Sequence, residues 1–183
     1  MCIRDSNTTT FFFPEGWVNL MYEYAITNIF APWIQLKNIN MSGENPNKEM
    51  YAIAQISKIM GLHRSTDKFG PIPYKQVGNG SFTVEYDSQE SVYRSFFEEL
   101  DEAVTVLYDF YMKANNTVPM ASDVVYEGDV TKWIRLANSL MLRLAIRVRY
   151  ADEVLARTYA EKAIKNPIGV MESIDDMAKM NRG

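Results

Sequence analysis

The chain has 183 residues, of which 47% are hydrophobic, 13% aromatic and 23% charged. This composition excludes a largely disordered chain and fits one compact globular domain, or part of a larger one. The net charge of -4 repels phosphate backbones, so we expect no nucleic acid partner. One cysteine and one histidine exclude an internal disulfide and the Cys/His cluster of a structural zinc site, and we predict no metal and no cofactor.

The sequence predicts neither a signal peptide nor a membrane span. It contains no run of about 20 apolar residues and no basic region followed by an apolar run near its start. Residues 1–6 resemble translated adapter sequence and are set aside, so Cys2 carries no meaning for lipid attachment. We therefore assign a helical domain to residues 7–183.

Apolar residues from Trp17 to Met41 recur at helical spacing. Proline interrupts this pattern at Pro32, which predicts a helix that is kinked or broken near Ala31. A turn-forming cluster at residues 42–48 follows, after which the apolar face Tyr51–His63 predicts a second helix.

Residues 65–87 contain two prolines and a Gly-Asn-Gly sequence, and they show no helical period. We predict a long ordered loop here. An alternation of apolar residues within it favours a short extended stretch over Phe82, Val84 and Tyr86.

Three further helices are predicted from capping residues and apolar stripes. Asp87 with Glu90 is typical of a helix start, and this helix runs for about 25 residues. Asp129 caps a fourth helix that continues to Val148, and Asp152 caps a fifth. The inward residues of the fifth helix are predicted to be Leu155, Tyr159, Ala163 and Ile164. A turn and a weakly helical C-terminal stretch are predicted to follow it.

Long helices joined by loops predict a mostly α fold of tetratricopeptide-like antiparallel helix pairs with long ordered loops. No 34-residue repeat can be counted in the sequence. Periodicity by itself therefore leaves the function unassigned.

Three sequence blocks resemble a known family. They are RSTDKFGPIPYKQV at residues 64–77, VEYDSQESVY at 84–93 and DVVYEGDVTKWIRLANSLMLRLAIRV at 123–148. In order and spacing they are similar to the SusD-like subgroup of the SusD/RagB outer-membrane lipoproteins. Three residues depart from the family pattern, namely Phe69 for tyrosine, Pro71 for aspartate and Val84 for proline.

The resemblance is best over residues 51–165 and looser over residues 17–38. Family members are longer, which implies that this chain is an internal fragment. The family further implies tetratricopeptide-like units, a lipid anchor outside this fragment, and a position over a SusC-like TonB-dependent transporter at the cell outer membrane. Its members capture oligosaccharides or other nutrients and pass them to the transporter.

Structural roles explain the residues that carry the resemblance better than catalytic roles do, and we predict no catalytic residue. Gly70 and the prolines around Ile72 fix a sharp loop, which lets Tyr74 pack its ring while its hydroxyl finds a partner. Arg143 and Arg147 share one helical face, where they are expected to clamp a buried carboxylate such as that of Asp67 or Asp87. The full structural set is Asp67, Gly70, Pro73, Tyr74, Tyr86, Asp87, Gly128, Asp129, Trp133, Asn138, Arg143 and Arg147.

Several charged residues also allow a catalytic interpretation. Glu98, Glu99, Asp101 and Glu102 offer paired carboxylates for glycoside cleavage, but a solvated helix face explains them more simply. His63 near Asp67 resembles a base with its orienting carboxylate, yet no serine or cysteine nearby has a nucleophile's setting. We therefore predict a packed or capping histidine. The arginines of the fourth predicted helix scatter around it, which disfavours a phosphate stripe.

Sugar binding needs an aromatic face for the apolar side of a pyranose and polar side chains for its hydroxyls. Trp33 stands next to an asparagine-rich segment, although it also fits the helical core spacing. The predicted ligand-binding residues are Trp33, Asn38, Asn40 and Asn45.

These observations favour a binding protein that captures a glycan or other nutrient for a SusC-like TonB-dependent transporter. The alternative is a tetratricopeptide-like scaffold that binds a protein segment and no sugar. A helical glycoside-processing enzyme is disfavoured.

Overall fold

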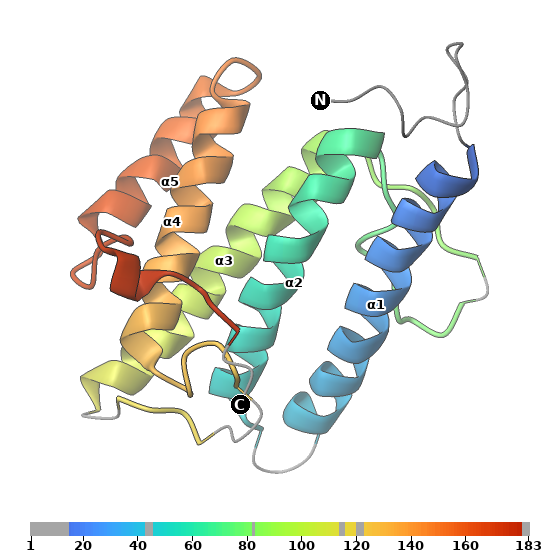
Figure 1. Ribbon diagram of the computed structural model, residues 1–183. Coiled ribbons are helices and arrows are strands. Elements are labelled where there is room, and N and C mark those ends of the chain that lie inside the picture. Colours follow the sequence, from blue (N-terminus) through green and yellow to red (C-terminus); the bar gives the residue numbers. More distant parts are fainter. Residues whose placement is uncertain (1–14, 43–45, 82, 114–115, 120–122, 181–183) are drawn as a thin grey trace, which may run out of the picture.

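The part of the chain that the structure describes forms five α-helices in this computed structural model (Figure 1). It comprises residues 15–42, 46–81, 83–113, 116–119 and 123–180. The predicted mostly α class is confirmed, because these residues form isolated antiparallel bridges but no strand. The elements are α1 (Glu15–Met41), α2 (Lys48–Phe69), α3 (Gln89–Met112), α4 (Val130–Val148), α5 (Glu153–Lys165) and the short 3₁₀ helix η2 (Ile174–Asp176).

Consecutive helices run antiparallel and pack side by side, in the order α1, α2, α3, α4 and α5 (Figure 1). Each helix contacts mainly its neighbours in sequence, while α2 also touches α4. Such nearest-neighbour packing is the rule in helical repeat proteins. The prediction of tetratricopeptide-like antiparallel pairs is therefore confirmed.

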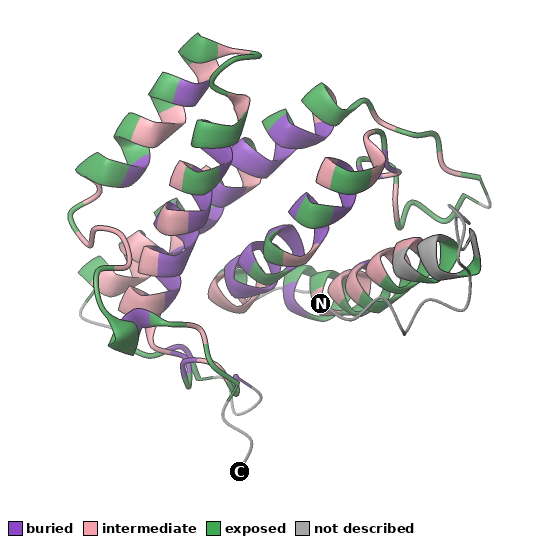
Figure 2. Ribbon diagram, turned by 45° about the horizontal axis from the view of Figure 1, so that its top comes forward, coloured by how far each residue is buried: buried purple, intermediate pink, exposed green. Residues whose placement is uncertain are grey.

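Helix α3 lies at the centre of the apolar core, between α2 and α4. Its stripe of aromatic and aliphatic residues includes Phe96, Phe97 and Leu100, all fully buried. Buried faces of the flanking helices point toward it (Figure 2). Burial of one such side chain stabilises the fold by about 1.5–3 kcal/mol.

Helix α1 runs through Pro32 as one helix, so of the kink or break predicted near Ala31 the break is wrong. Both residues are exposed. Packing of α1 on α2 holds the helix on either side of the missing amide. The approach is close, because a Cβ atom at Gly61 of α2 would lie 2.5 Å from Cδ1 of Ile29.

Helix α2 continues two turns beyond its predicted apolar face and ends at Phe69, so the loop predicted from residue 65 begins later. Ser65 and Thr66 are buried inside the helix, and this packing outweighs their modest helix propensity. Gly70 ends the helix with a φ of 76°, a conformation that favours glycine. The Gly70 amide donates to the Thr66 carbonyl oxygen at 2.8 Å.

The extended stretch predicted within the loop forms no strand in the described residues. Val84 and Tyr86 belong to no strand, and Phe82 lies outside the described residues. The bridge instead joins Ile72 to Asp87, whose main chains exchange hydrogen bonds of 3.2 and 2.9 Å. The alternating apolar residues form no strand because no neighbouring described strand pairs with them.

Two of the three predicted helix caps are confirmed. Asp129 accepts from the amides of Thr131 and Lys132 at the start of α4, and Asp152 accepts from Leu155 in α5. The third is wrong, because Ser88 caps α3 and Asp87 has a different role.

Helix α5 buries fewer of its apolar side chains than the sequence predicts. Ala163 is buried, and Leu155 and Tyr159 pack against the core. Ile164 is 63% exposed, so its predicted inward position is wrong. The weakly helical C-terminal stretch is present as η2, where Ser173 and Asp176 form a capping box.

We expect Leu100→Ala to lower the free energy of unfolding by about 3 kcal/mol, because it leaves a cavity among fully buried side chains. Leu20→Ala on α1 is the control, because Leu20 is 48% exposed and its loss should change stability by about 0.5 kcal/mol or less. Urea unfolding followed by circular dichroism measures both. Equal losses would contradict a core centred on α3.

Candidate functional site

The loop between α2 and α3 is held by the Asp87 carboxylate. Its Oδ2 atom accepts from the amides of Tyr74 at 3.2 Å and Lys75 at 2.9 Å. Together with the main-chain bridge to Ile72, these bonds close the loop on itself. Asp87 therefore shapes a loop and does not cap a helix, which corrects its predicted role.

A buried polar network joins this loop to the helices. Lys58 of α2 places its Nζ atom 2.8 Å from Oε2 of Glu99 on α3, and the Lys58 side chain is only 2% exposed. The Tyr74 hydroxyl donates to the same Glu99 oxygen at 2.5 Å. Glu99 is thus no part of a solvated helix face, contrary to the sequence prediction, while Tyr74 has the packed ring and bonded hydroxyl that were predicted.

Burial sets the ionisation of this network. It lowers the pKa of Lys58, while the carboxylate of Glu99 acts in the opposite direction. Burial also raises the pKa of Tyr74 well above its ordinary value, and the charge of Glu99 adds to that rise. The ammonium further lies 4.0 Å from the ring centre of Trp33 and 4.6 Å from that of Tyr74.

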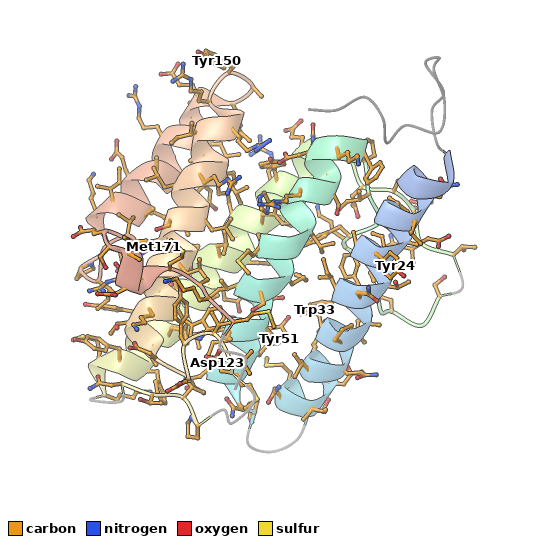
Figure 3. All side chains as sticks on the ribbon, in the orientation of Figure 1. Tyr24, Trp33, Tyr51, Asp123, Tyr150 and Met171 are labelled. Carbon is orange, nitrogen blue, oxygen red and sulfur yellow. The ribbon has the colours of Figure 1, made fainter. Side chains whose placement is uncertain are left out.

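Trp33 lies between α1 and α2, near Tyr51 (Figure 3). Its Nε1 atom donates to Oε1 of Gln55 at 2.6 Å, and its ring also packs edge-on against Phe30. Burial raises the pKa of the neighbouring Tyr51 to about 12, and Glu99 adds to that rise. The contacts of Trp33 thus tie α1 to α2.

The structure does not bring the predicted ligand-binding residues together. Asn38 is exposed and lies about 140° around α1 from Trp33. Asn40 is buried, and its amide donates to the Leu36 carbonyl oxygen at 2.9 Å. Asn45 lies outside the described residues.

A second cluster lies where α2, α3 and α4 meet. The Tyr93 hydroxyl donates to Oδ1 of Asp67 at 2.5 Å, and Arg147 contacts Oδ2 at 2.9 Å. The predicted clamp of Arg147 on Asp67 is confirmed, but it is not buried, because the Arg147 side chain is 44% exposed. The structure assigns no such role to Asp87, and Arg143 forms no ion pair with a described residue.

This cluster lines a cavity of about 340 Å³, which we name the Asp67 cavity. Its polar lining combines carboxylate and guanidinium groups with an amide. Gln89 donates from Nε2 to the Thr66 carbonyl oxygen at 2.7 Å, which leaves its Oε1 as an acceptor. Apolar side chains complete the wall. The lining includes Asp67, Gln89, Tyr93, Arg94, Arg147, Val148, Asp152 and Leu155.

The Asp67 cavity suits a ligand with many hydroxyl groups. Arg94 joins the rim by bonding Oδ2 of Asp152 at 2.8 Å. Burial raises the pKa of Tyr93, and its hydrogen bond to Asp67 adds to that rise, so the phenol keeps its proton. Carboxylates and guanidinium groups accept from and donate to sugar hydroxyls. The arrangement can therefore bind and orient such a ligand.

The loop before α4 folds around Asp123, a residue that the sequence analysis did not single out. Its Oδ2 atom accepts from the Trp133 indole at 2.7 Å and from the Gly128 amide at 2.8 Å. Burial raises the pKa of Asp123, but these hydrogen bonds outweigh it and hold the pKa below its usual range. Trp133 is buried and is the predicted core anchor. A run of acid, aromatic and glycine residues before a helix cap was the signal available in the sequence.

The glycine of this loop is required sterically. Gly128 has a φ of 80°, and a Cβ atom there would lie 2.2 Å from the Val118 carbonyl oxygen. Tyr126 then donates its hydroxyl to the Asp176 main chain at 2.5 Å. Arg135 bonds the Asp176 carboxylate at 2.8 Å, so the last described segment is fixed on α4.

Three further residues have structural positions. Asn138 donates to the Gly169 carbonyl oxygen at 2.8 Å. Tyr86 is 62% exposed and stacks on Tyr22. Pro73 is half-buried within the loop that Asp87 closes.

The alternative chemical interpretations find little support. His63 is buried and packed, with its Nδ1 atom 3.3 Å from the Ile59 carbonyl oxygen. Asp101 pairs with Lys162 at 2.6 Å, and Glu98 and Glu102 are exposed. Within the described ranges, no group of three or more His, Cys, Asp or Glu side chains is placed to hold a metal ion. None of the described helices is long and apolar enough to cross a bilayer.

The chain matches the SusD-like family model, described as "Susd and RagB outer membrane lipoprotein", over residues 3–183. A chitin-binding SusD homolog from Flavobacterium johnsoniae shares 36% identity at a TM-score of 0.85, covering 92% of this chain and 34% of that one. A SusD homolog from Bacteroides vulgatus shares 32% sequence identity at a TM-score of 0.83, and the match covers 92% of this chain and 34% of that one. A SusD homolog from Bacteroides uniformis shares 39% sequence identity at a TM-score of 0.75, and the match covers 86% of this chain and 31% of that one.

The chain therefore spans about a third of the length of these solved relatives. Among curated protein sequences, none matches it.

We expect Glu99→Ala to lower the free energy of unfolding by about 3 kcal/mol, because it leaves the Lys58 ammonium buried without its carboxylate. The loss should shrink as the pH rises from 7 to 10. A lowered pKa means that folded Lys58 releases its proton before the unfolded chain does, so stability rises with pH in that window. Urea unfolding across this pH range is the measurement.

Asp101→Ala is the matched control on the same helix. It removes the exposed pair with Lys162 and should cost less than about 1 kcal/mol, with no gain at high pH. If the two variants lose equal stability, the buried pair does not hold the loop and helices together.

Proposed function

Because the chain belongs to the SusD/RagB family of outer-membrane lipoproteins, we propose that the protein captures a glycan or other nutrient at the cell surface. In this proposal it passes its ligand to a SusC-like TonB-dependent transporter and is held at the outer membrane by a lipid anchor. SusD-like proteins are binding proteins, and we propose the same role without catalysis here.

One observation carries the proposal, namely the similarity to a chitin-binding SusD homolog at 36% identity over 92% of this chain. Chitin is a polymer of N-acetylated hexose units, which present hydroxyl and amide groups around an apolar ring face. Chito-oligosaccharides are therefore the first probes for this chain.

We place the ligand contact of this part of the protein at the Asp67 cavity. The carboxylates of Asp67 and Asp152 can accept from ligand hydroxyls, while Arg94 and Arg147 can donate to hydroxyl or acetamide oxygens. Leu155 adds an apolar surface for the ring. The sequence-based choice of Trp33 with the neighbouring asparagines stays a competing prediction, and a variant of Trp33 tests it below.

A protein-binding scaffold is the second candidate function. The turn between α4 and α5 exposes three large apolar side chains, Ile146 at 59%, Tyr150 at 87% and Val154 at 78%. Tyr150 stands at the far end of this helix pair (Figure 3). Exposed apolar patches of this kind mark contact surfaces for other proteins. A transporter that docks there would satisfy both candidates.

We expect Asp67→Asn to weaken binding of a chito-oligosaccharide at least about tenfold, because hydrogen bonds to charged groups contribute about 1.5–3 kcal/mol each. Isothermal titration of the purified chain with chitohexaose and with maltohexaose measures the affinities. Asp101→Asn on α3 is the charge-matched control and should bind like the parent chain.

Trp33→Phe separates the two candidate surfaces. It removes the hydrogen bond to Gln55 and keeps an aromatic core residue, so it should leave binding unchanged if the Asp67 cavity holds the ligand. Loss of binding in Trp33→Phe with full binding in Asp67→Asn would move the site to α1. Circular dichroism establishes that each variant is folded.

Gene context tests the transport role independently. Recovery of the surrounding DNA should show a TonB-dependent receptor gene next to this one, and a lipoprotein signal at the start of its reading frame. The absence of both, together with no glycan binding, would leave the scaffold function.

A further inference from the structure

A second polar groove, which we name the α2–α4 groove, opens between α2 and α4. Its volume is about 570 Å³, within the range of small-molecule sites. It shares no lining residue with the Asp67 cavity. One wall comes from the segment after α5, where the Met171 amide donates to Oγ of Ser139 at 2.8 Å (Figure 3). The lining includes Met60, His63, Arg64, Leu140, Arg143 and Met171.

His63, which lines the groove, has a buried nitrogen atom without a partner. His63 is 2% exposed, and its Nδ1 atom lies 3.3 Å from the Ile59 carbonyl oxygen. A carbonyl oxygen only accepts hydrogen bonds, so Nδ1 carries the proton of the neutral ring. Nε2 is buried and has no hydrogen-bond partner among the described residues. A buried polar atom left in this way is rare in folded proteins and points to a missing ligand atom.

The charges around His63 are predominantly positive. Arg143 of α4 and Arg64 of α2 line the same groove, and both side chains are exposed. The acid that acts on His63 is Asp67 on α2, whose carboxylate is already bound by Tyr93 and Arg147. The groove therefore presents two guanidinium groups with no carboxylate in its lining.

The rest of the lining is apolar. Met60, Leu136, Leu140 and Met171 surround the cations. A bare phosphate would find no use for these side chains, whereas a ring with a C–H face can pack against them. The combination of cations and apolar wall thus favours an organic carboxylate of about monosaccharide size.

We propose that the α2–α4 groove binds the carboxylate of a ring-shaped ligand such as a hexuronate. The Arg143 guanidinium binds the carboxylate in the manner of an arginine fork, with Arg64 at the open side. Nε2 of His63 then donates a second hydrogen bond to the carboxylate once the ring is protonated. This site is distinct from the Asp67 cavity and does not depend on the proposed transport role.

Binding is expected to take up a proton at His63. Burial lowers the pKa of His63, Arg143 lowers it further, and Asp67 acts in the opposite direction. A bound carboxylate neutralises Arg143 and attracts the imidazolium, so it raises that pKa. By linkage, the ligand binds the protonated form more tightly, and affinity increases as the pH falls.

The single histidine of the chain gives a direct test. In the 183-residue chain labelled with carbon-13, the Cε1–H signal of His63 reports its protonation by nuclear magnetic resonance. We expect sodium galacturonate to shift this signal in a saturable manner, to raise the pKa of His63, and to bind about tenfold more tightly at pH 5.5 than at pH 8. Cyclohexanecarboxylate tests whether a carboxylate on a plain ring suffices, and glucose is the neutral control.

Arg143→Gln should abolish the response to galacturonate, while Arg157→Gln, which removes an exposed arginine of α5, should keep it. A signal that does not move with galacturonate overturns the proposal, as does an equal shift with glucose or an unchanged response in Arg143→Gln. Binding by both carboxylates supports the site and assigns recognition to the carboxylate and ring. Tighter binding of galacturonate than of cyclohexanecarboxylate supports the site and shows that the sugar hydroxyl groups are recognised as well.

Discussion

The burial of one lysine ammonium organises the first half of the structure. A charge taken out of water must be paired and bonded, and its partners must come from whatever segments surround it. Lys58 of α2 receives a carboxylate from α3 through Glu99 and an aromatic face from α1 through Trp33. Tyr74, from the intervening loop, bonds the same carboxylate. One charged atom thus holds three helices and a loop in a single arrangement.

The second half of the structure also buries a charged group, in this case a carboxylate. Asp123 is a buried anion, and its donors are the Trp133 indole and three amides of its own loop. Apolar packing joins the two halves through α3, but packing alone is compatible with several loop paths. The two buried charges reduce that freedom, because each loop must follow a path that supplies their partners.

The sequence predicted what depends on local pattern and missed what depends on distant partners. The apolar stripes of α3 and α4 and the cap at Asp129 are local, and the structure confirms them. The extension of α2 through Thr66 depends on burial by other elements, and it was missed. Lys58 and Glu99 each resemble solvated residues of an amphipathic helix. Nothing within one helix reveals that the two side chains meet, so the network that shapes the loop was not predicted.

The Asp67 cavity and the α2–α4 groove owe their different charge to one pairing between two helices. His63 and Asp67 lie four residues apart on α2, and Arg143 and Arg147 lie four apart on α4, so each pair shares a helical face. Arg147 neutralises Asp67 on the cavity side. Arg143 has no carboxylate opposite it, because the position facing it on α2 carries a histidine whose burial favours the neutral ring. A cavity that combines carboxylates with guanidinium groups and a groove lined by guanidinium groups without a carboxylate are therefore neighbours, and the Asp67 carboxylate acts on the His63 imidazole.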